Sequence, residues 1–156
     1  MKRYMILPIL FAVILSLSAC GEPPTVQSDF SSSFTVSRGD IDYAGTIAKD
    51  GTELTVIFTE PYTVNGTAFC WDGETLSIRY AGHSTQANAD YLPADSVPAV
   101  LHNALCYLPQ AVYTETADGE DHFSLPTPCG DASLTAADGV PTSLTDPLSG
   151  TVYTFS

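Results

Sequence analysis

The chain has 156 residues and a formal net charge of −13, from 5 Lys and Arg against 18 Asp and Glu. That length fits one domain with its own hydrophobic core, and 44% apolar residues against 15% charged ones exclude a disordered acidic tail. A charge of this sign repels phosphate backbones, so the sequence excludes a nucleic-acid partner.

The first 20 residues have the pattern of an export signal. Lys2 and Arg3 precede an apolar stretch over residues 5–17, which is too short for a stable membrane span. The stretch ends in Leu-Ser-Ala-Cys-Gly at residues 17–21, which resembles the bacterial lipobox. The resemblance implies that the lipoprotein signal peptidase frees Cys20 and that this thiol carries diacylglyceryl. An ordinary secretory signal, with Cys20 incidental, is the alternative.

The lipobox interpretation divides the chain into three parts. Residues 1–19 are the signal peptide, residues 20–29 are the lipidated Cys20 and a tether, and residues 30–156 form one domain. Loss of two basic residues leaves three against 18 acidic ones, a net charge of −15. Two or three acyl chains, at about 0.8 kcal/mol per buried CH₂, hold a protein stably on a membrane. The predicted location is therefore a cell membrane, lipid-anchored on the extracytoplasmic side.

The pattern from residue 30 to residue 80 predicts antiparallel strands. Gly and Pro number 11 each, beside 8 Tyr and 7 Phe, which favours a turn-rich β protein. Apolar and polar residues alternate, as in strands with one buried face, and glycine-containing turns separate the segments. The predicted strands cover residues 30–36, 41–47, 54–59, 63–71 and 75–80.

One segment has the period of a helix, which we expect over about residues 96–108. Asp95 or Ser96 suits the N-cap, and Pro109 ends the segment. A single apolar stripe predicts that one side packs on the sheet and that the other side, with His102, faces water or a loop. The stripe consists of Val97, Val100, Leu101, Ala104, Leu105 and Leu108.

The rest of the chain returns to strands, connected by Asp-Gly turns at residues 118–119 and 138–139. The predicted fold class is mainly β, of α+β type. We expect an antiparallel sheet with one amphipathic helix packed on it. The C-terminal strands are predicted over residues 111–116, 121–125, 131–135, 142–145 and 151–155.

Three segments resemble the LolA/LolB-like lipoprotein-carrier superfamily in pattern: residues 30–58, the hairpin around Asp72-Gly73 and the tail over residues 133–156. The resemblance implies a curved antiparallel sheet or half-barrel, half-open, that wraps the helix around an apolar cavity for acyl chains. The candidate cavity-lining residues are Leu54, Val56, Phe58, Leu101 and Leu105.

Three further cysteines, Cys70, Cys106 and Cys129, allow one disulfide at most. Cys106 lies opposite the apolar stripe, and the loop of Cys129 could reach it, so a Cys106–Cys129 bridge is the candidate. Three unpaired thiols are the alternative. His102 precedes Cys106 by four residues and could activate its thiol, but neither an orienting group nor an oxyanion hole can be identified from the sequence. We therefore assign no catalytic residue.

No metal site or cofactor is expected. His102 with Cys106, and the run Glu120-Asp121-His122, lack the ligand spacing of zinc and calcium sites. Asp40 and Asp42 share one strand face, at a spacing along the strand that also occurs between the two carboxylates of glycosidases. In so acidic a chain we attribute this spacing to chance. Aromatic residues gather around the second hairpin, where a sheet core is expected and a ligand cleft or partner surface is the alternative. They are Tyr62, Phe69, Trp71, Tyr80 and Tyr91.

These features predict a non-enzymatic, membrane-anchored lipoprotein that binds a hydrophobic ligand or an envelope protein. A structural or interaction protein of the cell envelope without a ligand cavity is the alternative, and an enzyme is third. A cavity of a few hundred cubic ångströms along the candidate lining would favour ligand binding, whereas a filled core would favour the alternative.

Overall fold

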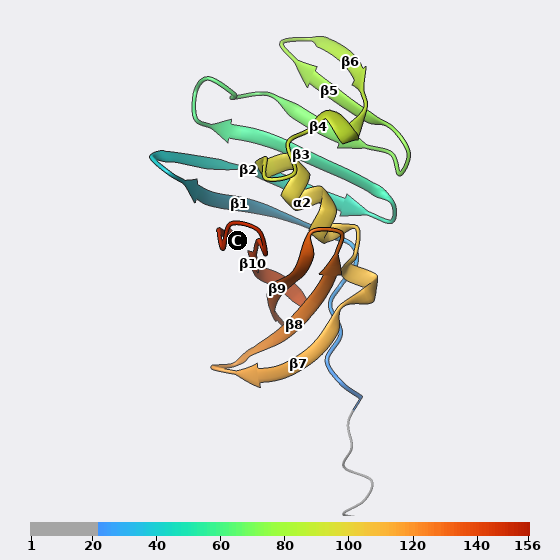
Figure 1. The fold of residues 1–156 in the computed structure, drawn as a ribbon, viewed down its shortest axis with the longest axis vertical. Coiled ribbons are helices and arrows are strands. Elements are labelled where there is room, and N and C mark those ends of the chain that lie inside the picture. Colours follow the sequence, from blue (N-terminus) through green and yellow to red (C-terminus); the bar gives the residue numbers. More distant parts are fainter. Residues whose placement is uncertain (1–21) are drawn as a thin grey trace, which may run out of the picture.

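The computed structural model describes residues 22–156, in which eleven strands form one sheet and helix α2 (Val97–Leu105) lies across it (Figure 1). Short 3₁₀ turns at Ala89–Tyr91 and Leu108–Gln110 flank the helix. The first strands are β1 (Phe30–Arg38), β2 (Ile41–Asp50), β3 (Glu53–Glu60), β4 (Ala68–Trp71), β5 (Leu76–Tyr80) and β6 (His83–Ala87). The last are β7 (Val112–Ala117), β8 (Glu120–Thr127), β9 (Gly130–Ala137), β10 (Val140–Thr145) and β11 (Val152–Phe155).

All strand pairs are antiparallel, in the order β6-β5-β4-β3-β2-β1-β11-β10-β9-β8-β7. The last strand returns to the first, with Phe34 opposite Phe155 and Val36 opposite Tyr153. Strands β6 and β7 are the two edges of this unclosed, curved sheet. The predicted fold class, a curved antiparallel sheet with one packed helix, is confirmed for the part of the chain that the structure describes.

The two Asp-Gly hairpins form as predicted. Asp118 and Asp138 have φ of 54° and 51°, and the glycines that follow them have φ of 86° and 80°. Two consecutive positive φ values define the tight turn whose twist matches antiparallel strands, and Asp-Gly tolerates both. The same pair of residue types therefore connects β7 to β8 and β9 to β10.

Two segments differ from the prediction. Residues 63–67 are a loop of turns rather than a strand, because Val64 N–H donates to Pro61 O and Thr67 N–H to Val64 O, at 3.0 and 2.9 Å. Strand β6 was not predicted, since its sequence His-Ser-Thr-Gln-Ala has no alternation. An edge strand without a buried face has no alternating hydrophobic pattern from which it could be predicted.

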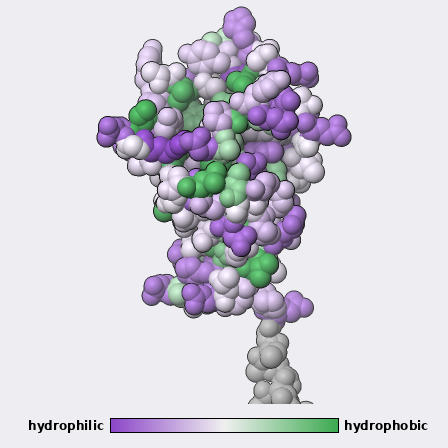
Figure 2. All heavy atoms as spheres, viewed as in Figure 1, coloured by the Kyte–Doolittle hydropathy of each residue, from purple (hydrophilic) through white to green (hydrophobic). Residues whose placement is uncertain are grey.

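Helix α2 is buried on more sides than one stripe allows. Seven of its nine residues are buried, because the helix packs between the β2–β5 half of the sheet and the β8–β10 half. The prediction that only one side of the helix is packed is wrong, because a curved sheet encloses a helix that a flat sheet would contact on one side. On the outer surface shown in Figure 2, hydrophobic residues occur in small groups among hydrophilic ones.

A close contact between Phe34 and Gly45 shapes the centre of the sheet. The two residues are opposite one another on β1 and β2, and a Cβ at Gly45 would lie 2.7 Å from the Phe34 ring and 2.2 Å from Ile57 O. Glycine is therefore required there on space alone. The Phe34 ring meets Phe58 edge-to-face at 5.8 Å, which aims Phe58 along the inner face of the sheet.

Part of the predicted tether is docked on the domain. Val26 packs against the core, Gln27 N–H donates to Gly139 O at 2.8 Å, and Gly51 N–H donates to the Asp29 carboxylate at 2.8 Å. The expected signal peptide and the lipid attachment at Cys20 lie outside the described residues. Within residues 22–156, no helix is long and apolar enough to cross a membrane.

Candidate functional site

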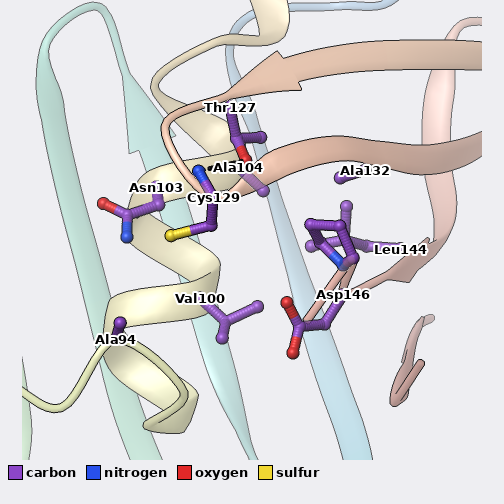
Figure 3. A pocket seen from close by; sticks show the side chains of 10 residues that line it. Ala94, Val100, Asn103, Ala104, Thr127, Cys129, Ala132, Leu144 and Asp146 are labelled. Carbon is purple, nitrogen blue, oxygen red and sulfur yellow. Dashed lines mark hydrogen bonds between the residues drawn. The ribbon is translucent and has the colours of Figure 1, made fainter. Parts of the chain in front are cut away.

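The candidate lining residues of the acyl cavity divide into two groups. Leu54, Val56, Leu101 and Leu105 are fully buried in the core, whereas Phe58 borders an apolar groove. The space shown in Figure 3 lies between α2 and the β8–β10 half of the sheet, and its volume is only about 10 Å³. That holds one water molecule at most. The interior is therefore filled where the sequence placed the cavity.

The apolar groove has a volume of about 260 Å³ and lies where the inner face of β1–β4 meets the start of α2. Its size is just below the range of about 300–1,000 Å³ that is usual for small-molecule sites. The walls are mostly aromatic rings and aliphatic side chains, with polar groups at few points. They comprise Arg38, Tyr43, Phe58, Val64, Thr67, Phe69, Leu92, Pro93, Ser96, Val97 and Pro98.

A series of aromatic rings runs from the groove into the core. Phe58 meets Phe69 edge-to-face at 5.9 Å, Phe69 stacks on Trp71 at 6.2 Å, and Trp71 stacks on His102 at 4.6 Å. Such pairs restrict one another's orientation beyond what burial alone achieves. The rings of Phe58 and Phe69 are consequently held in place as walls of the groove.

An ion pair closes one side of the groove. Arg38 at the end of β1 donates to the Asp95 carboxylate at 2.8 Å and to its backbone carbonyl. The hydrogen bond and charge of Arg38 lower the pKa of Asp95, and Asp95 raises the pKa of Arg38. The pair fastens the segment before α2 to β1. Beside it, the Ser96 hydroxyl is buried in the groove wall without a hydrogen-bond partner among the described residues.

A second cleft of about 280 Å³ lies on the other side of Leu92, which borders both spaces. Trp71, Asp90, His102 and Asn103 contribute to its walls. Burial lowers the pKa of His102, so the neutral imidazole is favoured. His102, expected as a solvated residue, is half-buried instead: its ring stacks on Trp71 and borders this cleft.

The structure does not form the Cys106–Cys129 disulfide, and all three described cysteines are free. Cys129 points toward α2 beside Val100 and Asn103 (Figure 3), whereas Cys106 is exposed at the helix end, near Lys49 of β2. Burial raises the pKa of Cys106 more than Lys49 lowers it, so the thiol is not activated as a nucleophile.

Acidic residues considered above, in the Glu120-Asp121-His122 run and in the Asp40–Asp42 pair, accept hydrogen bonds from nearby hydroxyl groups. Thr142 donates to Glu120 at 2.8 Å and Thr116 donates to Asp121 at 2.6 Å. Ser37 donates to Asp42 at 2.6 Å. Within residues 22–156 no three His, Cys, Asp or Glu residues gather as they would around a metal ion.

Sequence reasoning missed most of the groove. Tyr43 was recognisable as an inward residue of an alternating strand, and Phe69 as part of an aromatic group. Val64 and Leu92 lie in irregular segments, where no periodicity marks the side chains that will be buried. Only a fold that brings residues 61–67 and 88–96 to the same strand ends assigns them to one site.

Comparisons with known proteins identify no family. No family model matches the chain, and no curated protein matches it. Among solved structures it is similar to the LolA superfamily protein NE2245 from Nitrosomonas europaea, at 15% identity over 86% of this chain and 87% of that one, with a TM-score of 0.44. It is also similar to a chain in the complex of the CwlD amidase from Clostridioides difficile with the GerS lipoprotein, at 12% identity over 89% and 84%, with a TM-score of 0.42. Neither similarity carries a functional conclusion.

Proposed function

We propose that this chain is a membrane-anchored extracytoplasmic lipoprotein whose domain binds a hydrophobic group in the apolar groove and catalyses no reaction. The observation that carries the binding role is the groove itself: about 260 Å³, walled by Tyr43, Phe58 and Phe69. Apolar walls of this kind stabilise an apolar group that leaves water. The lipobox-like sequence ending at Cys20 supports the anchor.

Trp71 makes the binding role testable, because it is the only tryptophan and stacks on the groove wall through Phe69. Bromine quenches indole fluorescence at short range. Terminally brominated octanol, a neutral probe, should quench Trp71 of the chain from residue 22 in a saturable manner. Val64→Arg should abolish this by filling the groove, and Val112→Arg, at an exposed site on β7, should not. Equal quenching in both variants contradicts the proposal.

The anchor has a separate test. Cys20→Ser should leave the full chain unprocessed or missorted and remove its partition into detergent, since a hydroxyl is a far poorer acceptor for the lipid. Retention with membranes after a carbonate wash, together with normal processing, would show that Cys20 is not the lipid attachment site.

The alternative, an interaction protein without a ligand cavity, is favoured by one observation: Leu54, Val56, Leu101 and Leu105 fill the interior where a carrier would hold acyl chains. On this alternative the groove is a shallow contact surface. Quenching by brominated octanol that rises linearly with concentration, without saturation, would favour it.

A further inference from the structure

We infer that the groove and the exposed side chains around it are the docking surface for a basic protein segment that inserts one apolar side chain. This inference rests on the proposed function, which supplies the groove as a binding site, and goes beyond it by naming the occupant. The docking surface consists of the groove together with Ile41, Tyr62 and Tyr91.

Large apolar side chains project around the groove. Tyr62 is 92% exposed in the loop that supplies Val64, and Tyr91 is 85% exposed directly before Leu92. Ile41 is 46% exposed on β2, two residues before Tyr43 and on the same strand face. Tyrosine is enriched at protein interfaces because its ring buries a large area while its hydroxyl keeps a polar contact. An apolar pocket rimmed by such residues suits an anchoring side chain.

The charged residues near the groove indicate which charge a partner should carry. Asp40, in the β1–β2 turn, and Glu60 and Asp90, in the segments that border the groove, are exposed. Of the three basic residues after residue 21, Arg38 is paired with Asp95 and Lys49 is buried, which leaves Arg79. The field at the docking surface is therefore negative, so it attracts a basic partner and repels anionic lipid headgroups.

The position of the surface also favours a protein over the bilayer. The chain enters at Phe30, and the groove is bordered by Arg38 at the other end of β1. Nine strand residues span roughly 30 Å. In Figure 1 the segment before β1 runs past β7–β9, away from the β2–β6 half. With an anchor at Cys20, the docking surface lies away from the membrane, where a soluble or envelope protein can reach it.

The experiment uses the chain from residue 22, which contains every strand and every core residue of the domain. The probe is the peptide Lys-Lys-Ser-Gly-X-Gly-Ser-Lys-Lys, in which X is para-bromophenylalanine. Matched peptides carry Glu in place of Lys, or carry Ala at X and are titrated as competitors of the bromophenyl peptide. Quenching of Trp71 is titrated in about 20 mM and about 500 mM NaCl, where screening lengths differ severalfold.

We expect saturable quenching by the basic bromophenyl peptide, at least about tenfold tighter than by the acidic one in low salt, with the difference shrinking in high salt. The double variant Tyr62→Ala/Tyr91→Ala should weaken binding by about fivefold or more, as interface tyrosines do. Val112→Ala, also at an exposed position, should leave it unchanged. Equal affinity for the acidic peptide, or displacement of the bromophenyl peptide by the Ala peptide with equal affinity, overturns the inference.

Failure of the inference and failure of the proposed function remain distinguishable. Saturable quenching by brominated octanol, or by vesicles of brominated phosphatidylcholine, with none by any peptide, would make the occupant a lipid and overturn the inference alone. Absence of quenching by every probe would overturn both.

Discussion

His102 and Trp71 stack with their ring centroids 4.6 Å apart and their planes 17° apart, at the interface between α2 and β4. The stack leaves the imidazole half-buried, and this burial lowers the pKa of His102 below its ordinary value of 6.5. A histidine at this position therefore links the stability of the helix-sheet interface to pH.

The first prediction concerns that linkage. In the unfolded chain His102 binds a proton near pH 6.5, whereas the folded chain resists protonation to lower pH. The unfolded state then holds more protons, so the free energy of unfolding should fall as pH drops below about 6.5. His102→Phe retains an aromatic stack and removes the titration, so it should flatten this slope. Urea denaturation at several pH values from 7.5 to 5.5 gives the free energy of unfolding as a function of pH. Its slope is about 2.303RT per pH unit for each proton that the unfolded state binds in excess of the folded state.

His83→Phe is the matched control, because His83 is exposed on β6. It should leave the pH dependence of unfolding unchanged. An identical slope in the wild type and in His102→Phe would mean that His102 does not carry the linkage.

A second prediction concerns Gly45. A methyl group there would meet Ile57 O and the Phe34 ring at distances that atoms do not adopt, so the sheet must shift to admit it. Gly45→Ala should destabilise the domain by about 2 kcal/mol or more, as overpacking does. Thr46→Ala, at the next and exposed position of β2, should cost about 1 kcal/mol at most. Thermal melts of both variants compare them, and equal melting temperatures would contradict the packing.

The cysteines allow a third prediction. Under non-reducing, denaturing conditions, the chain from residue 22 should titrate as three free thiols, because Cys70, Cys106 and Cys129 are all unpaired in the structure. A Cys106–Cys129 disulfide would leave one free thiol, that of Cys70. Cys106→Ser should leave the melting temperature unchanged without reductant, whereas loss of a disulfide costs 2–5 kcal/mol in typical small domains.

Lys49 carries the fourth prediction. It is 6% exposed, donates to Gly51 O and has no carboxylate partner among the described residues, so its charge is costly to bury. Lys49→Met keeps the apolar stem and removes the charge, so stability should stay within about 1 kcal/mol of the wild type or rise. Lys49→Glu puts an anion beside a carbonyl and should cost several kcal/mol. Chemical denaturation separates the two; a Lys49→Met variant as unstable as Lys49→Glu would show that the ammonium itself is required.

Sequence patterns predicted the architecture well, because strand alternation, Asp-Gly turns and the helical stripe are local signals. The Asp118 and Asp138 turns and the core residues Leu54 and Val56 follow from them. The candidate site depended on curvature, which no local signal encodes. Curvature brings both halves of the sheet to α2, fills the expected cavity and turns His102 onto Trp71, leaving a groove whose walls come partly from irregular segments.

The most direct measurement of the central claim is an isotope-filtered NOE experiment on the chain from residue 22, labelled with ¹³C and saturated with unlabelled octanol. The account predicts NOEs from the terminal methyl of octanol to the rings of Phe58 and Phe69 and to the methyls of Val64, the apolar walls of the groove. NOEs confined to exposed positions such as Val112, or unchanged in the Val64→Arg variant, would contradict it.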